Sequence, residues 1–518
     1  MEIHLGRRVA ALRQELGLDQ SEFAELLGMT QSRVSQIEDS PWLQKRTLDN
    51  ILAKTGRDLP TLLGLVPAEQ ADSAARGMAA ERARFEEACQ RFAGFLNGWL
   101  DRTVPRLPPR EALLLCEEIL TLTHSFADPW AQTLRAQTLL RLADLRETLG
   151  EYTSAQASLE ACLKLCERLG DTPRQQACLY KLGTLHYRSG DYEEALSYFR
   201  QAAAAEDWQM RYRGLVGQSV VHEQRGEFEA ALNCLEEAEA VLPKEGGAGP
   251  SLAQIYIASA RVNVALARGD YGAAEALACQ AWEAARQAGD RGAELEQRIN
   301  LALCRHHLGR DEEALELLRE ARSQPEAAEQ KRRWSLIHAV EAQVQSSRGE
   351  PEAAVAAGEE ALRVAEALGE KVCLFYAHLG LGEAYRGQAA HRSFHHYQQA
   401  LHIATAADLR IYQALAWERL AHLHLELGEW ADAEAAAERA VAGAASLGAQ
   451  AIQAWALLHR ARAQAALGRL EAAQESARRA AWVLQGRTLP RIEAALRQFF
   501  PGVLDPPPRT AGDGNGKD

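Results

Sequence analysis

The side chains of this 518-residue chain that could support redox or metal chemistry are its cysteines and histidines. Cys162 and Cys166 lie one helical turn apart and Cys178 follows closely, so a redox or metal-binding role is one interpretation. The other is that the nine scattered cysteines are small core residues. His391 and His395 share a helix face, but no carboxylate or cysteine completes a ligand set. The histidines therefore predict no metal site.

Enzyme motifs are missing from the sequence. It contains no phosphate-binding loop, nucleophile elbow, zinc-protease helix or dinucleotide fingerprint, so we expect no catalytic residues, no cofactor and no enzyme. The net charge of −13 excludes a general nucleic-acid binder, and any contact with DNA must come from a local basic face. No apolar run is long enough for a bilayer and no secretory leader is present. We expect a cytoplasmic protein without a membrane partner.

One short pattern returns along most of the chain. Its clearest copy is Gly190-Asp-Tyr-Glu-Glu-Ala195, and successive copies lie 36 to 43 residues apart. The glycines of the nine copies are Gly150, Gly190, Gly226, Gly269, Gly309, Gly349, Gly387, Gly428 and Gly468. Glycine can end a helix in a left-handed conformation, and an acidic residue after it suits the beginning of the next helix. Each copy therefore predicts the turn of a helical hairpin.

Small residues recur at fixed distances from each of these glycines. A mostly small residue stands seven places before the glycine, and alanine stands five and twelve places after it in most copies. Such residues let two helices approach closely, so we expect the arms of each hairpin to pack on each other. The copy at Gly387 departs from this rule, because Arg392 falls at the fifth place. A one-residue insertion in that turn would restore the pattern with Ser393 and Ala400.

The pattern resembles the tetratricopeptide repeat, lengthened from about 34 to about 40 residues, over residues 130 to 485. The resemblance implies an all-α solenoid that curves into a superhelix, whose concave wall binds a peptide or protein ligand. In that arrangement the first helix of each hairpin lines the wall. The ligand-binding residues predicted in this way are Tyr180, Tyr187, Arg213, Tyr256, Asn263, Glu296, His306 and Gln343. The alternative is that these positions are polar only because an inner face is solvated.

The first sixty residues carry a different pattern. Residues 3 to 16 have the periodicity of an amphipathic helix, and Asp19-Gln-Ser-Glu22 is a capping box that begins a second helix. Gly28 makes the next turn, and Thr30 caps a third helix. A fourth helix is expected from about 47 to 54. Short helices joined by a glycine turn are typical of the helix-turn-helix plan.

The spelling QSEFAELLGMTQSRVSQIE from Gln20 to Glu38 closely resembles the Cro/repressor-like (XRE-type) helix-turn-helix family. The resemblance implies that the third helix enters the major groove of a DNA operator and that Arg13 and Glu38 tie the first helix to it. It places Gln31, Ser32 and Gln36 toward base edges, and Gln20, Arg33, Ser35, Lys45 and Arg46 toward phosphates. Glutamine can bind adenine bidentately, and basic side chains neutralise phosphates, so the chemistry agrees. The alternative is a domain that no longer touches DNA.

These patterns predict an all-α chain with an N-terminal helix-turn-helix domain followed by a tetratricopeptide-like superhelix. The expected segments are a DNA-binding domain (1–63), a linker (64–78), connector helices or a degenerate capping repeat (79–129), about nine repeats (130–487), a C-terminal capping helix (488–504) and a disordered tail (505–518).

The combination is similar in architecture to the peptide-pheromone-receptor regulators, where an oligopeptide binds the concave face and rearranges a dimer. The resemblance implies a homodimeric, sequence-specific transcription regulator that is switched by a peptide or protein ligand. Two other classes stay open. One is a non-enzymatic scaffold whose N-terminal module serves for dimerisation. The other is a redox or metal sensor that uses Cys162, Cys166 and Cys178.

Overall fold

The computed structural model describes residues 4–40, 43, 45–55, 62, 87, 91, 94–95, 98–104, 107–124, 126, 128–243, 251–324, 327, 330–485, 487 and 489–504. The predicted linker, the predicted tail and much of the connector lie outside these residues. The chain divides into two compact units, Met1–Cys178 and Leu179–Asp518, so the boundary falls inside α10 (Thr172–Ser189). All the regular elements in the described ranges are helices, which confirms the all-α prediction.

The helices of the first unit are α1 (Leu5–Glu15), α2 (Gln20–Leu27), α3 (Gln31–Asp39), α4 (Lys45–Thr55), α7 (Pro109–Thr123), α8 (Pro129–Leu149) and α9 (Tyr152–Leu169). Those of the second, after α10, are α11 (Tyr192–Ala203), α12 (Trp208–Gln224), α13 (Phe228–Ala240), α14 (Leu252–Arg268), α15 (Tyr271–Ala288), α16 (Arg291–His307), α17 (Asp311–Ser323), α19 (Lys331–Ser347), α20 (Pro351–Leu368), α21 (Lys371–Tyr385), α22 (Ala390–Ala406), α23 (Arg410–Leu427), α24 (Trp430–Leu447), α25 (Gln450–Ala466), α26 (Leu470–Val483) and α27 (Pro490–Phe499).

The N-terminal helices form as the local signals predict. Asp19 accepts from the backbone amides of Ser21 and Glu22, and the Glu22 carboxylate accepts from the amide of Asp19, which completes the capping box. Gly28 ends α2 in a left-handed conformation with φ 66°. The Thr30 side chain then caps α3. Between the helices lies one apolar core that includes fully buried Val9, Phe23, Val34 and Ile51.

Nine helical hairpins follow, one at each predicted glycine. The hairpins are α8–α9, α10–α11, α12–α13, α14–α15, α16–α17, α19–α20, α21–α22, α23–α24 and α25–α26. The turn glycines all have φ between 76° and 90°, a region that residues with a Cβ rarely adopt. The repeat pattern therefore predicted the turn within each of these nine hairpins.

The small residues lie where the paired helices meet. Every residue seven places before a repeat glycine is buried, and in the eight regular copies those five and twelve places after it are at most 1% exposed. In the irregular seventh copy Ser393 and Ala400 are fully buried, and the Ser393 hydroxyl donates to the carbonyl of Gly382. The predicted one-residue insertion is thus confirmed.

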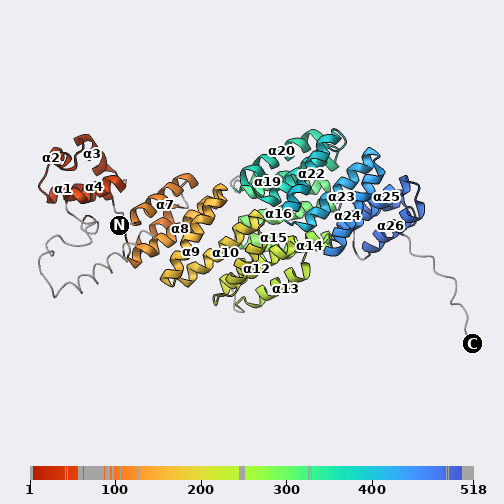
Figure 1. The fold of residues 1–518 in the computed structure, drawn as a ribbon, viewed down its shortest axis with the longest axis horizontal. Helices are drawn as coiled ribbons and strands as arrows, with labels where there is room; N and C mark the ends of the chain where they lie inside the picture. Colours follow the sequence, from red (N-terminus) through yellow and green to blue (C-terminus); the bar gives the residue numbers. More distant parts are fainter. Residues whose placement is uncertain are drawn as a thin grey trace, which may run out of the picture. The chain divides into compact units, whose positions relative to one another are not determined.

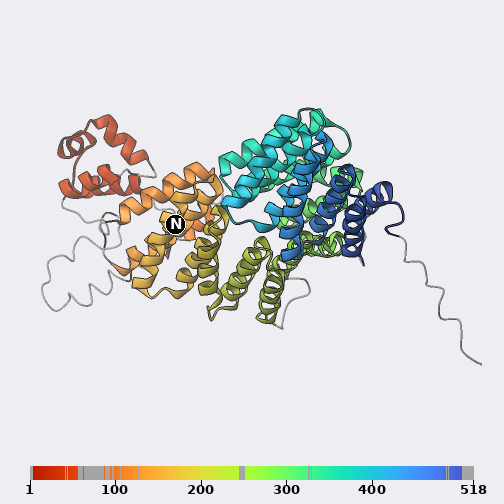
Figure 2. The same ribbon diagram turned by 45° about the vertical axis from the view of Figure 1, so that its right-hand side comes forward.

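The second unit winds until distant hairpins touch. Leu447 lies against Gly226 and Ala451 lies against Gly269, so the turns after α12 and α14 contact the end of α24 and the start of α25 (Figures 1 and 2). Two ion pairs also join residues far apart in the sequence. They are Arg487–Asp270, separated by 217 residues, and Arg491–Asp311, separated by 180 residues, and each measures 2.5 Å. The repeats of this unit therefore form a superhelix that winds back on itself.

Close packing at a helical glycine gives a direct test of this architecture. A Cβ on Gly214 in α12 would lie 2.4 Å from the backbone nitrogen of Ala203, whereas a Cβ on Gly272 in α15 would meet nothing within 4 Å. We expect Gly214→Ala to reduce the free energy of unfolding by about 1–3 kcal/mol. Gly272→Ala should instead stabilise by up to about 1 kcal/mol, because glycine is a poor helix former. Thermal melting followed by circular dichroism measures both, and equal midpoints would contradict the packing.

Candidate functional site

Helix α3 presents a row of polar side chains to solvent. Gln31, Ser32 and Gln36 are exposed, and so is Arg33, while Val34 and other apolar side chains on the opposite face are buried. The guanidinium of Arg33 donates to the side-chain oxygen of Gln36 at 3.1 Å. The three side chains predicted to face base edges are therefore all accessible from one helix.

A buried carboxylate fixes the position of this helix. Arg13 of α1 donates from Nε to Glu38 at 2.6 Å, and Gln20 of α2 donates to the other oxygen of Glu38 at 2.7 Å. Arg13 also donates to the carbonyl of Leu18 at 2.9 Å. The predicted Arg13–Glu38 tie is confirmed. Since all three helices meet at Glu38, the orientation of α3 depends on this network.

The remaining residues predicted to contact phosphates lie on α2, α3 and α4. The Gln20 side chain holds Glu38, Ser35 is partly exposed, and Arg46 is exposed on α4. Lys45 begins α4, but its side chain lies outside the described residues. The phosphate-binding role of these four residues stays a prediction.

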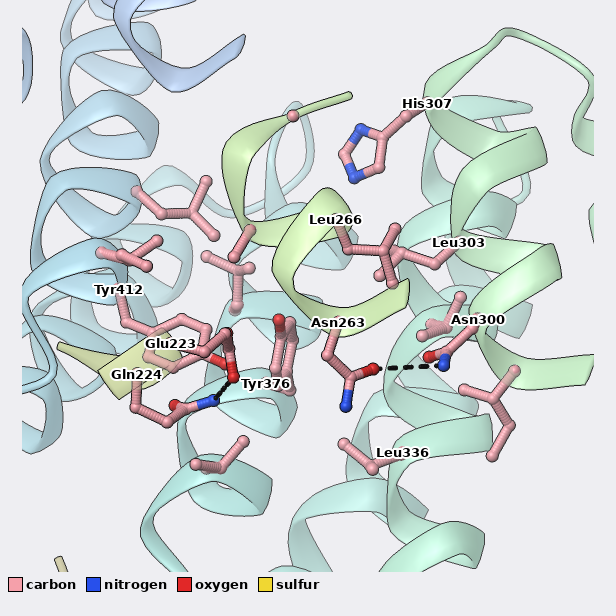
Figure 3. Close-up of a pocket in the computed structure, with 18 of the residues that line it drawn as sticks. Glu223, Gln224, Asn263, Leu266, Asn300, Leu303, His307, Leu336, Tyr376 and Tyr412 are labelled. Atoms are coloured by element: carbon pink, nitrogen blue, oxygen red, sulfur yellow. Dashed lines mark hydrogen bonds between the residues drawn. The ribbon is translucent and has the colours of Figure 1, made fainter. Parts of the chain in front are cut away.

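The interior of the second unit holds a cavity of about 180 Å³. Of the eight ligand-binding residues predicted from the sequence, Tyr187, Asn263, Glu296 and Gln343 line it. The Asn300 amide donates to the Asn263 side-chain oxygen at 3.2 Å, one of the interactions drawn in Figure 3. The structure thus brings half of the predicted set together, and their ligand-binding role stays a prediction.

The other four predicted residues lie outside the lining of this cavity. The Tyr180 ring packs on Phe199, and Arg213 donates to the hydroxyl of Tyr212 at 3.4 Å. The Tyr256 hydroxyl donates to Asp290 at 3.3 Å, and His306 is hydrogen-bonded to Asp311 at 2.8 Å. Their partners are neighbouring residues of the fold.

Sequence reasoning missed Tyr376, Tyr412 and Arg419, which also line the cavity. Tyr412 and Tyr376 pack edge to face with ring centroids 5.5 Å apart. These residues come from α21 and α23, far along the chain from the hairpins of Tyr187 and Asn263. They reach the cavity only because the superhelix winds back on itself, and no local spacing indicates that.

The arginines at the cavity are each paired with a carboxylate. Arg332 binds Glu370 at 2.8 Å, Arg333 binds Glu296 at 2.9 Å, and Arg419 binds Glu383 at 3.2 Å and Glu418 at 3.4 Å. Burial alone would raise the pKa of Glu296, but Arg333 and Arg332 together lower it below its ordinary value. The positive charge around the cavity is therefore balanced within the protein.

Glu223 at the end of α12 is the exception. It is 6% exposed, and among the described residues no ion pair joins its carboxylate to a cation. Its hydrogen-bond donor is the amide of Gln224 at 2.8 Å (Figure 3). Burial raises the pKa of Glu223 to about 8, against the smaller opposing effects of Gln224 and of the charge on Arg332. The cavity thus contains one buried, uncompensated carboxyl group.

His307 at the opposite side of the cavity is neutral at physiological pH. Burial, and then the neighbouring His306, Arg419 and Arg491, hold its pKa well below the ordinary value. Its ring stacks on Tyr271 with centroids 4.1 Å apart. His307 therefore offers the cavity a neutral imidazole.

The three neighbouring cysteines have the surroundings of core residues. Cys162, Cys166 and Cys178 are fully buried, and the sulfur atoms of Cys162 and Cys166 are 3.9 Å apart. A hydrogen bond with Cys178 and burial raise the pKa of Cys162, and burial raises the pKa of Cys166 to about 12. Such thiols stay protonated at neutral pH, whereas redox-active cysteines need an accessible thiolate. The redox interpretation therefore loses its support.

One surface group of ligand-type side chains has a structural explanation. His424, Glu429 and Asp432 come close enough to share an ion. However, His424 and Glu429, 2.6 Å apart, repeat a pair that bridges other hairpin turns. The matching pairs are His186–Asp191, His222–Glu227 and His306–Asp311. The recurring pair fastens one helix end to the next helix.

Comparison with known families agrees with this organisation. Residues 4–58 match the family described as helix-turn-helix domain. Residues 134–205 and 180–250 match families described as tetratricopeptide repeat. No match was found among the curated proteins. None of the helices in the described part of the chain has both the length and the apolar character that a bilayer span requires.

Several solved structures are similar at low identity. A Rap protein complexed with competence and sporulation factor is 14% identical, with 76% of this chain and 99% of that chain covered and a TM-score of 0.46. The Rap conjugation gene regulator of the plasmid pLS20, in complex with the Phr* peptide, is 15% identical, with 69% of this chain and 96% of that chain covered and a TM-score of 0.48. The apo form of the quorum sensor NprR from B. thuringiensis is 15% identical, with 66% of this chain and 99% of that chain covered and a TM-score of 0.42.

The ionisation of Glu223 should be visible in the pH dependence of stability. This carboxyl titrates near its ordinary pKa of about 4.3 when unfolded and near 8 when folded, so between these values the folded state binds more protons. The stability that this group contributes is therefore lost as the pH rises toward 8. Glutamine does not ionise, so it avoids the cost of a buried charge at high pH. The melting temperature of Glu223→Gln relative to the wild type should therefore rise by several degrees between pH 5 and 8.5.

The control for this measurement is Glu236→Gln, which changes an exposed carboxylate on α13. The difference in melting temperature between this variant and the wild type should not change with pH over the same range. A melting difference for Glu223→Gln that does not change with pH would show that this group ionises normally.

Proposed function

We propose that this chain, which joins a Cro/repressor-like helix-turn-helix domain to tetratricopeptide repeats, is a cytoplasmic, homodimeric, sequence-specific transcription regulator. In this proposal α3 reads a double-stranded DNA operator, and the repeats of the second unit bind a ligand that controls DNA binding. Neither catalysis nor a cofactor is part of the proposal.

The observation that carries the DNA-reading role is the surface of α3. A capped helix presents Gln31, Ser32 and Gln36 to solvent together, and a buried network around Glu38 holds that helix in place. Glutamine side chains can hydrogen-bond an adenine edge in the major groove.

The observation that supports ligand control is the cavity. Its volume of about 180 Å³ is below the roughly 300–1,000 Å³ typical of sites for drug-sized ligands. In this conformation it has room for a small molecule or for one long side chain. The extended peptide or protein segment expected from the sequence would need the contacts between Leu447 and Gly226, and between Ala451 and Gly269, to separate.

The coupling follows from the winding of the superhelix. A ligand shifts a conformational equilibrium only by its preference for one state over another. A ligand that favours a more open or a more closed second unit would change its curvature and, in a homodimer, the spacing of the two reading helices. DNA-binding dimers require half-sites at a fixed spacing, so a change of a few ångströms is enough.

A second candidate is a protein-interaction scaffold in which the N-terminal domain only dimerises. One observation favours it. Leu470 is 65% exposed and Trp482 is 70% exposed on α26, and exposed large apolar side chains can mark a protein contact. A scaffold would show no DNA sequence preference at any salt concentration.

The DNA-reading proposal can be tested by selection from a randomised duplex library. We expect the wild-type chain to enrich one sequence. The triple variant Gln31→Ala, Ser32→Ala, Gln36→Ala should bind that sequence at least about 30-fold more weakly, because each bidentate base contact contributes about 1–3 kcal/mol. Its circular dichroism spectrum should stay unchanged.

The matched control is Gln14→Ala, which removes an exposed glutamine from α1. It should leave the selected sequence and its affinity unchanged. If the triple variant selects the same sequence with the same affinity, α3 is not the reader, and the absence of any enriched sequence would favour the scaffold.

A further inference from the structure

We propose that the cavity of the second unit is a receptor site for an organic cation, a primary ammonium or a guanidinium group, held by the carboxylate of Glu223 and the side-chain oxygen of Gln224. The idea that this cation is a signal for DNA binding rests on the proposed function. Binding itself concerns the second unit and can be measured without DNA.

The first argument is the charge of the lining. A buried charge is costly unless a partner compensates it. Each arginine at the cavity already has its own carboxylate, namely Glu370 for Arg332, Glu296 for Arg333, and Glu383 and Glu418 for Arg419. An anionic ligand would have to displace one of these internal partners. Among the described residues Glu223 has no cationic partner, so a positively charged group is the ligand that would compensate its charge.

The second argument is an unused hydrogen-bond acceptor beside Glu223. Gln224 uses its amide nitrogen to donate to the Glu223 carboxylate, and its oxygen Oε1 is buried without a hydrogen-bond partner. Buried polar atoms are nearly always satisfied in proteins. Two adjacent acceptors, a carboxylate and an amide oxygen, match a ligand group that carries several N–H donors. Ammonium and guanidinium groups have that property.

The third argument is the aromatic wall. Tyr376 and Tyr412 stand next to Glu223 and Gln224 at one side of the cavity, as Figure 3 shows, and Tyr187 also lines it. Aromatic faces attract cations, and the attraction is stronger away from water. A carboxylate surrounded by tyrosine rings therefore favours an organic cation over a strongly hydrated metal ion.

The size of the cavity restricts the ligand. Its volume of about 180 Å³ is below the roughly 300–1,000 Å³ typical of sites for drug-sized ligands. The amides of Asn263 and Asn300, joined by one hydrogen bond, supply further polar contacts away from Glu223. A short aliphatic amine or one basic side chain fits this description, and both sources share the same cationic group.

The protonation of Glu223 predicts how binding depends on pH. The titratable and charged groups that face it are Arg332 and the hydroxyls of Tyr187, Tyr192, Tyr376 and Tyr412. In the free protein Glu223 holds its proton over much of the neutral range, because its pKa is about 8. A bound cation stabilises the carboxylate, so binding releases a proton and tightens as the pH rises through 8.

The test is isothermal titration calorimetry of the full chain with agmatine, putrescine and the blocked tripeptide acetyl-Gly-Arg-Gly-amide. 1,4-Butanediol serves as the neutral analogue of putrescine. We expect at least one cation to bind with a stoichiometry of one, at least tenfold more tightly at pH 8.5 than at pH 6.5, and butanediol not to bind. If only the tripeptide binds, the source of the cation is a peptide side chain. Binding of the free amines alone identifies a small metabolite.

Variants connect the binding to the site. Glu223→Gln keeps the shape of the side chain and should weaken binding at least tenfold, whereas Glu236→Gln should leave it unchanged. Tyr376→Leu should weaken binding more than Tyr376→Phe, which keeps the ring. The assignment is overturned if no cation binds, if butanediol binds equally well, or if Glu223→Gln binds like the wild type.

Failure of this assignment is distinguishable from failure of the proposed function. The triple variant of α3 should bind the cation normally, since its substitutions lie in the other compact unit. A chain that binds the cation through Glu223 and selects no DNA sequence would support this site and overturn the DNA-reading proposal.

Discussion

The structure depends on how closely two paired helices can approach. At each hairpin the chain reverses at a glycine in the left-handed conformation, and alanine-sized residues then lie between the two arms. Larger side chains would push the arms apart and alter the angle at which each hairpin stacks on the next. Because the angle repeats, small local distances determine the curvature of the whole second unit.

The turn glycines serve a second purpose once the superhelix has wound back. A Cβ on Gly269 would lie 2.4 Å from the Ala451 methyl group, and one on Gly226 would lie 2.6 Å from the Leu447 side chain. The turns of early hairpins thus pack directly against late helices, and Arg487 and Arg491 add ion pairs between the same regions. This contact partly closes off the concave wall and leaves a small cavity.

Enclosure changes the electrostatics of that wall. A carboxylate on an open concave face would be solvated, but a buried one must find a partner or hold a proton. In the part of the chain that the structure describes, the arginines of the cavity are internally paired, whereas Glu223 has no cationic partner. The N-terminal domain also contains a buried carboxylate, but there the carboxylate is compensated. There the buried Glu38 has both Arg13 and Gln20 as partners, and it holds a helix in place.

The sequence by itself determined the elements that depend on local interactions. The capping box at Asp19, the turn at Gly28 and all nine hairpin turns follow from residues within one or two helical turns of each other. The accessible row on α3 could be predicted for the same reason, because one helix fixes the relative directions of its own side chains.

Only the tertiary structure decided what the concave wall became. Tyr187 and Asn263 could be placed on the wall from their repeat positions, but Tyr180, Arg213 and Tyr256 occupy similar positions and lie outside the cavity. Tyr376 and Arg419 join it from hairpins far along the chain. Their approach depends on small stacking angles summed over several repeats, and no residue pattern within one repeat records that sum.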